Sequence, residues 1–250
     1  MYPRPQLKRE SFFLLNGQWD FAFDDENIGV LEGWSHTVRG DRKINVPFTY
    51  ETGKSGIGDE RPHGVIWYWK NITITNEFKK DQSIQINFEG CDYHLDLWVN
   101  GVYKGSHDGA YTRFAFELGK FAEGEEVLLS IRVEDPHSEE QVRGKQRWLS
   151  DNYGCWYVQT TGIWKDVWLE QVSDDYVEKI KITPDIYKKT VTIHTMCHSN
   201  KENLIMKSDV YFEGKFINSV SGKLEAGVCQ MDIDVYNKYV GEWGDRTVES

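Results

Sequence analysis

The side chains best suited to binding chemistry gather in and beside a long polar stretch, residues 136–154. Aromatic rings can stack on the C–H faces of a pyranose, and planar Arg and Gln side chains can fix its hydroxyl groups. The candidates for such contacts are Trp148, Trp156 and Tyr157, with Arg143, Lys145, Gln146 and Arg147 between them. A tryptophan in an alternating strand is more often a core residue. We expect that role for Trp19, Trp67 and Trp168, whereas both roles stay open for Trp148 and Trp156.

No catalytic motif accompanies these residues. The sequence has no nucleophile elbow, HExxH pair, P-loop or dinucleotide fingerprint. Carboxylates such as Glu134 and Asp135 are adjacent, so in a strand they point to opposite faces and cannot flank one bond. The histidines have no partners at metal-binding spacing, and the four cysteines show no CxxC pair. We therefore expect no catalytic residue, no metal and no cofactor in these 250 residues.

Composition excludes several classes of partner. The net charge of −11 argues against a nucleic acid, because phosphate binding needs clustered Lys and Arg. No apolar run approaches the roughly 18 residues of a membrane span, and the first residues lack the apolar core of a signal peptide. We expect a cytoplasmic protein with reduced, buried thiols. Pairing of Cys197 with Cys229 across a sandwich is an alternative, and a homo-oligomer is compatible with the sequence.

Strand patterns fill the first 172 residues. In the segment "HLDLWVNGVYKG", Leu95, Leu97 and Val99 would lie on one face of a strand and Asp96 and Trp98 on the other. Asn100-Gly101 follows directly. Asn and Gly best tolerate the positive φ angles of a type I′ turn, so the segment predicts a β-hairpin. Similar runs separated by turn residues predict a β-sandwich; they are 17–24, 43–48, 65–75, 83–90, 112–118, 125–135 and 162–172. Two long loops interrupt them, residues 49–64 and 136–154, and loops of this length are often functional.

Composition changes near residues 171–179. Nine of the ten tryptophans precede residue 170. Five plainer runs follow, at 178–186, 189–198, 204–214, 215–222 and 228–236. They predict a second, smaller immunoglobulin-like sandwich over 173–250, after a first domain over 1–172. Five strands are fewer than such a domain needs, and the missing pairing would leave an exposed edge. We therefore expect the second domain to be incomplete and the chain to be part of a longer one.

Several segments together resemble the N-terminal part of family 2 glycoside hydrolases, the group of β-galactosidases, β-glucuronidases and β-mannosidases. The most specific are "FEGCDYHLDLWVNGVYKGSHDGAYTRFAFEL" (88–118) and "CWYVQTTGIWKDVWLE" (155–170). Shorter matches are "LNGQWDF" (15–21), "VPFTYE" (46–51) and "VIWYWKNITI" (65–74). The resemblance covers nearly all of residues 10–172. It implies a jelly-roll sugar-binding domain, an immunoglobulin-like domain and then a catalytic (β/α)8 barrel that these residues do not contain.

The resemblance also implies where substrate would be met. The barrel would supply a glutamate acid/base and a glutamate nucleophile for retaining hydrolysis, which accounts for the missing catalytic motif. Where β-galactosidases carry Asn-Pro-x-Gly, this chain has "RPHG", with Arg61 in the place of the Asn. Where galactosidases and glucuronidases carry an Asp six residues before the Gly of their Gly-Ile motif, it has Trp156 before Gly162. Both departures leave the identity of the sugar open.

Three functions are therefore compatible with the sequence. The first is the non-catalytic N-terminal part of a family 2 glycoside hydrolase that acts on a carbohydrate substrate. The second is a free-standing carbohydrate-binding module, and the third is a purely structural sandwich. Candidate substrate contacts are Arg61, Arg143, Gln146, Trp148, Trp156 and Tyr157. The 250 residues alone are expected to be catalytically inactive.

Overall fold

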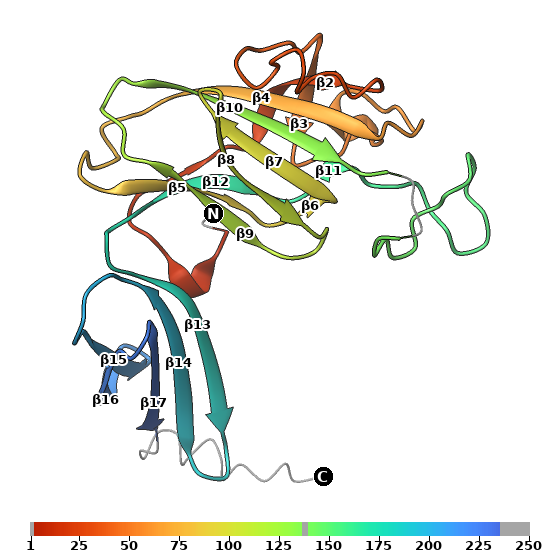
Figure 1. The fold of residues 1–250 in the computed structure, drawn as a ribbon. Helices are drawn as coiled ribbons and strands as arrows, with labels where there is room; N and C mark the ends of the chain where they lie inside the picture. Colours follow the sequence, from red (N-terminus) through yellow and green to blue (C-terminus); the bar gives the residue numbers. More distant parts are fainter. Residues whose placement is uncertain (1–2, 137–139, 236–250) are drawn as a thin grey trace. The chain divides into compact units, whose positions relative to one another are not determined.

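The computed structural model describes residues 3–136 and 140–235, so the last part of the expected second domain, residues 236–250, lies outside the described residues. Its regular structure is β throughout, apart from two single-turn 3-10 helices, η1 (Pro5–Leu7) and η2 (Gly53–Ser55). The chain divides into two compact units. The first runs from Arg9 to Val172, and the second combines the segment that ends at Lys8 with the chain from Ser173 onward. Each is described by itself (Figure 1).

Two antiparallel sheets form the first unit. The larger has six strands in the order β3 (Arg42–Val46), β2 (Gly17–Phe23), β4 (Val65–Thr73), β10 (Glu126–Glu134), β7 (His94–Val99) and β8 (Val102–Asp108). The smaller has the order β1 (Phe12–Leu14), β12 (Val167–Val172), β5 (Ser83–Phe88) and β9 (Phe114–Gly119). A short pair, β6 (Cys91–Asp92) with β11 (Gly162–Ile163), completes the unit. The predicted strands are thus present, and sequence analysis missed only the short β1 and β6.

The main core lies between these two sheets. Alternate residues of β4, β7 and β10 face alternate residues of β5 and β12, as period-two patterning requires. Ile66, Leu97 and Ile131 from the large sheet and Ile86 and Leu169 from the small one are fully or almost fully buried. The expected core tryptophans Trp19, Trp67 and Trp168 are also buried, which confirms that prediction.

A second cluster covers the other face of the large sheet. Trp67 and Trp69 point away from the main core and stack on each other, with ring centroids 5.8 Å apart. The polypeptide after β2 folds over them: Asp24 accepts a hydrogen bond from Trp67 Nε1 (3.0 Å), and the carbonyl of Trp34 accepts one from Trp69 Nε1 (2.8 Å). Strand β4 is therefore buried on both faces, which explains its unbroken apolar run "VIWYW".

The predicted hairpin joins β7 to β8. Asn100 and Gly101 have φ angles of 49° and 78°, as a type I′ turn requires. The Asn100 side chain also accepts a hydrogen bond from the backbone N–H of Leu128 (2.8 Å). Trp98 stacks beside Trp67 at 5.4 Å. Both conspicuous residues of the hairpin are therefore structural.

The second unit contains five of the chain's strands. A three-stranded sheet has the order β13 (Tyr176–Asp185), β14 (Thr190–His198) and β17 (Val228–Asp234), and β15 (Ile205–Phe212) pairs with β16 (Lys215–Lys223). Burial alternates along β17, as the predicted one-sided strand requires. The core is small: among the described residues its buried apolar side chains are Ile193, Cys229, Met231 and Ile233.

The four cysteines are free thiols. Cys91 and Cys229 are buried, but Cys155 is exposed, so the expectation of buried thiols fails for Cys155. Cys197 and Cys229 lie on neighbouring strands of one sheet, β14 and β17, instead of facing each other across a sandwich. None of the helices within residues 3–136 and 140–235 is long and apolar enough to cross a membrane.

Candidate functional site

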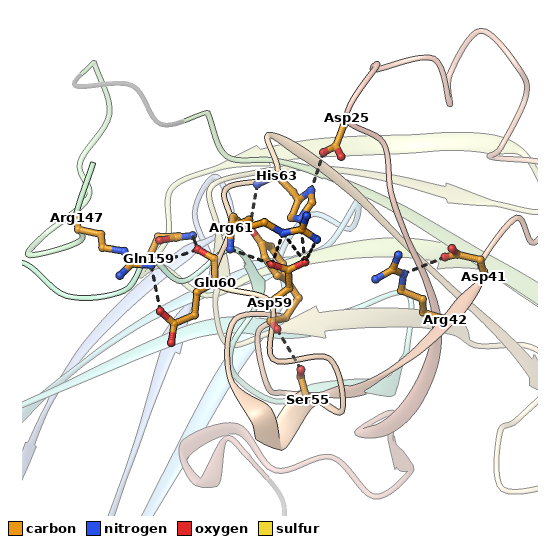
Figure 2. Close-up of polar contacts among 11 residues, drawn as sticks. Asp25, Asp41, Arg42, Ser55, Asp59, Glu60, Arg61, His63, Arg147 and Gln159 are labelled. Carbon is orange, nitrogen blue, oxygen red and sulfur yellow. Dashed lines mark hydrogen bonds and ion pairs between the residues drawn. The ribbon is translucent and has the colours of Figure 1, made fainter. Parts of the chain in front are cut away.

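The two long loops meet at Glu60. The Glu60 carbonyl accepts hydrogen bonds from Arg147 Nη2 (3.2 Å) and Gln159 Nε2 (3.1 Å), and its carboxylate pairs with the same Arg147 nitrogen at 3.2 Å. Figure 2 shows these three side chains converging beside Arg61. Arg147 and Gln159 are almost fully buried, whereas the Glu60 side chain is 59% exposed. Segments about 90 residues apart in sequence are therefore joined at Glu60.

Arg61 follows Glu60 directly, and an ion pair with Asp59 orients its guanidinium. Its Nε donates to Asp59 Oδ1 (2.9 Å) and its Nη2 donates to Asp59 Oδ2 (2.5 Å), a two-point ion pair (Figure 2). This pair holds the pKa of the Asp59 carboxyl well below its usual range. The Arg61 side chain is otherwise 77% exposed. Two of its five N–H groups are engaged by Asp59, and the others face outward from an oriented guanidinium.

The loop beneath Arg61 is anchored by aromatic residues. The buried His63 ring stacks on Phe23 with centroids 3.6 Å apart, and its Nδ1 lies 2.7 Å from Asp25 Oδ1. The hydroxyl of Tyr50 accepts a hydrogen bond from the His63 backbone N–H (3.1 Å) and donates one to the Arg61 carbonyl (3.2 Å). The backbone on both sides of Arg61 is thus held to the sandwich.

Three aromatic rings cluster on the other loop. The Trp148 ring centroid lies 4.7 Å from that of Trp156 and 5.5 Å from that of Tyr153, both edge to face. Trp148 is 42% exposed and the neighbouring Tyr157 is 61% exposed, whereas Trp156 is partly buried between the other rings. Neither tryptophan is part of the two apolar clusters of the first unit. Both tryptophans therefore lie outside the sandwich core, in a cluster where Trp148 is exposed and Trp156 is partly buried.

Arg143 and Gln146 are buried and make their hydrogen bonds within the chain. Arg143 Nη2 donates to the Arg147 carbonyl (3.2 Å), and Gln146 Nε2 donates to Asp92 Oδ2 (2.7 Å). Four of the six candidates are thus exposed or partly exposed: Arg61, Trp148, Trp156 and Tyr157. Arg143 and Gln146 are buried and form hydrogen bonds with other residues of the chain. Sequence analysis missed Asp59, Glu60 and Asp92. Asp59 could have been found from its i, i+2 spacing to Arg61.

Three buried carboxyls lie behind the two loops. Burial, together with the charge of Asp135, raises the pKa of Asp92 to about 7. Burial likewise raises the pKa of Glu51 to about 7. Asp135 accepts a hydrogen bond from Thr161 Oγ1 (2.8 Å) and another from Gln141. Raised values of this kind are common at functional sites, but they also arise in structural networks.

The carboxylates of the Arg61 loop and its surroundings have basic partners. Asp25, Asp59 and Glu60 pair with His63, Arg61 and Arg147 respectively. No group of three or more His, Cys, Asp or Glu side chains within the described ranges is placed to hold a metal ion. The exposed rings of Trp148 and Tyr157 and the exposed guanidinium of Arg61 are groups that can contact a polar ligand.

Comparisons with curated proteins give relatives named for glycosidase activity. The chain is 28% identical over 165 residues to a putative β-glucuronidase of Formosa agariphila, covering 63% of this chain and 19% of that protein. It is 27% identical over 213 residues to a β-galactosidase of Thermoanaerobacterium thermosulfurigenes, covering 84% and 28%. The chain thus spans well under half the length of these relatives.

Solved structures share the fold. The crystal structure of Ruminococcus gnavus β-glucuronidase superposes with a TM-score of 0.68 at 16% identity, covering 95% of this chain and 41% of that one. A Bifidobacterium dentium β-glucuronidase gives a TM-score of 0.70 at 17% identity, covering 93% and 42%. The model of the family described as "Glycosyl hydrolases family 2, sugar binding domain" matches residues 12–173, which span the first unit. The chain therefore belongs to family 2 of the glycosyl hydrolases and carries the sugar binding domain of that family.

Proposed function

We propose that this chain is the non-catalytic N-terminal part of a longer, retaining β-glycosidase, with its two catalytic glutamates on a (β/α)8 barrel. The names of the relatives, galactosidases and glucuronidases, support a β-glycoside as substrate. The lengths of those relatives support further chain beyond the matched part. We assign the first unit as a jelly roll and the second as an incomplete immunoglobulin-like sandwich, in a cytoplasmic enzyme that can form homo-oligomers.

One observation carries the sugar-contact part of this proposal. The loop with the aromatic cluster and the loop with the oriented Arg61 are joined at Glu60, and this junction makes them one candidate contact surface. Trp148, Trp156 or Tyr157 supplies an apolar face for a pyranose ring, and Arg61 supplies paired N–H donors. Because Asp59 offsets the charge of Arg61, this surface suits sugar hydroxyl groups better than a sugar carboxylate. Arg143 and Gln146 contribute by holding the aromatic loop, residues 147–156, in place.

Two variants test the contact surface. In the full-length enzyme, Trp156→Ala and Arg61→Ala should each lower kcat/KM by about 5- to 150-fold, equivalent to about 1–3 kcal/mol of lost transition-state binding. Tyr187→Ala is the control, because this ring is 92% exposed in the other unit. Thermal midpoints should be nearly unchanged. Unchanged kcat/KM would exclude that residue from substrate contact, and a large fall in the midpoint for Trp156→Ala would make the ring structural.

The absence of catalysis is tested on the 250 residues alone. The purified chain should not hydrolyse nitrophenyl β-galactoside, β-glucuronide or β-mannoside faster than a heat-denatured control, because the proposal places both catalytic glutamates on a barrel outside these residues. Turnover above the control would overturn the proposal. A reading frame that continues past codon 250 into barrel-like βα repeats would support it, whereas a stop codon there would favour a free-standing binding module.

A further inference from the structure

Asp92 joins the two ends of the aromatic loop to the sandwich. It lies in β6, which pairs with β11, and is only 1% exposed. Its Oδ2 atom accepts a hydrogen bond from Gln146 Nε2 (2.7 Å) and lies 3.5 Å from Thr160 Oγ1. Gln146 and Thr160 also bind each other, because the Thr160 backbone N–H donates to Gln146 Oε1 at 2.8 Å. One carboxyl group thus meets a residue before the aromatic cluster and a residue after it.

The loop closes on itself directly above this contact. Gln146 and Tyr157 form a parallel bridge. The backbone N–H of Arg147 donates to the Tyr157 carbonyl (2.6 Å), and that of Tyr157 donates to the Lys145 carbonyl (2.9 Å). Residues 147–156, which carry the aromatic cluster, therefore leave and return at one narrow base. Gln146 is the residue of that base whose side chain reaches Asp92.

Other contacts hold the flanks of this base. Arg147 and Gln159 bind Glu60, and Gln141 and Thr161 bind Asp135. The aromatic rings contact one another and do not join the sandwich core. The groups of opposite and like charge that face Asp92 are Arg143 and Asp135. The Asp92 Oδ1 atom is buried and has no hydrogen-bond partner among the described residues.

We propose that Asp92 is a positioning residue: through Gln146 it sets the orientation of the Trp148–Trp156 loop that meets the sugar. The sugar-binding part of this inference rests on the function proposed above, whereas the fixing of the loop does not. Asp92 touches no substrate and acts only through Gln146 and Thr160. An amide can accept the same hydrogen bond with its oxygen, so Asp92→Asn should preserve the loop. A leucine cannot accept that bond and should release it.

The test compares hydrogen exchange in four forms of the chain: wild type, Asp92→Asn, Asp92→Leu and a control, Asp24→Asn. Asp24 is the matched control because it is also a buried acid, but it fixes a different segment through Ile28, Gly29 and Trp67. Peptides that cover 145–157 should exchange at least 10-fold faster in Asp92→Leu. In Asp92→Asn they should stay within about 3-fold of wild type. In Asp24→Asn any acceleration should be confined to 24–36.

Should Asp92→Leu fail to fold, Gln146→Met removes the same contact from the loop side and should give the same local acceleration. Unchanged exchange over 145–157 in a folded Asp92→Leu or Gln146→Met variant would overturn the proposal. Equal acceleration throughout the domain would also overturn it, since the residue would then be generally structural.

Sugar binding is measured separately, by tryptophan fluorescence titration with methyl β-galactoside, β-glucoside and β-glucuronide. If the wild-type full-length enzyme binds one of them, Asp92→Leu should weaken that affinity at least 10-fold. Asp92→Asn should bind the same sugar with an affinity close to that of wild type. If wild type binds none, the proposed function fails at this surface while the exchange experiment still decides the role of Asp92. If Asp92→Leu releases the loop but binds the sugar as tightly as wild type, loop orientation does not determine sugar affinity. That result would refute this part of the proposal.

Discussion

Replacing Glu51 by glutamine should change how the stability of the first unit depends on pH. Glu51 is 6% exposed, and neither carboxylate oxygen has a hydrogen bond of normal geometry within the described residues. Burial raises its pKa from 4.5 to about 7, and the hydroxyls of Thr49 and Thr161 lie close enough to moderate the rise. An ionised Glu51 is therefore unfavourable in the folded chain, whereas a neutral amide of similar shape is not.

The size and sign of the effect follow from the two pKa values. A rise from 4.5 to about 7 is equivalent to about 3 kcal/mol, because each pKa unit is equivalent to about 1.4 kcal/mol. The folded chain keeps a proton that the unfolded chain loses between these values. The stabilisation from Glu51 is therefore fully present below about pH 4.5 and is lost as the pH rises through about 7. Asp92 acts in the same direction, but it is present in both proteins and cancels in their difference.

The assay is urea unfolding followed by tryptophan fluorescence at pH 5, 6, 7 and 8. This signal reports mainly on the first unit, since nine of the ten tryptophans precede residue 170. Relative to wild type, Glu51→Gln should gain about 2.5 kcal/mol between pH 5 and pH 8, because part of the full effect is already lost at pH 5, and the denaturant slope should be unchanged. The exposed Glu123→Gln controls for the loss of a surface charge. A stability difference between Glu51→Gln and wild type that is the same at all four pH values would refute the reasoning.

Three further results are expected. Gly101→Ala should lower the free energy of unfolding by about 1–3 kcal/mol, because φ is 78° and a Cβ there would lie 2.1 Å from His36 Nδ1; chemical denaturation measures it, and full stability would contradict the turn geometry. Trp67→Ala should cost about 3–5 kcal/mol in the same assay while Trp148→Ala costs less than about 1, and equal losses would contradict the difference in burial. Limited proteolysis should cut first near residues 172–178 and leave a stable piece that ends close to Val172; first cuts within 60–130 would count against a domain boundary there.

Much of the fold follows from local pattern. Asn100-Gly101 fixes one hairpin, and period-two alternation locates strands such as β7 and β17. The pattern is less informative where a strand is buried on both faces. Nothing local shows that Trp67 and Trp69 face a second cluster, because the chain that covers them comes from residues 24–38. The two-residue strand β6 is too short to show any periodicity.

The residue types of the candidate site could be predicted from the sequence, but the tertiary contacts that hold them could not. The aromatic residues and Arg61 stand out as residue types, and the structure brings their two loops together. Their supports do not stand out, because Glu60 contributes largely through its backbone carbonyl and Asp92 looks like any turn residue. The buried position of Gln146 also depends on a partner distant in sequence, Asp92. These contacts arise from tertiary folding, which local spacing does not encode.

The junction at Glu60 has a consequence for how this surface can evolve. Arg147 and Gln159 both bind the carbonyl oxygen of residue 60, an atom that every amino acid supplies. Replacements at Arg61, one position along, leave that oxygen in place. Natural variation can therefore exchange the guanidinium for an amide or a smaller group without separating the two loops. If the proposed sugar contact holds, the ligand preference can change at position 61 while the two loops stay joined.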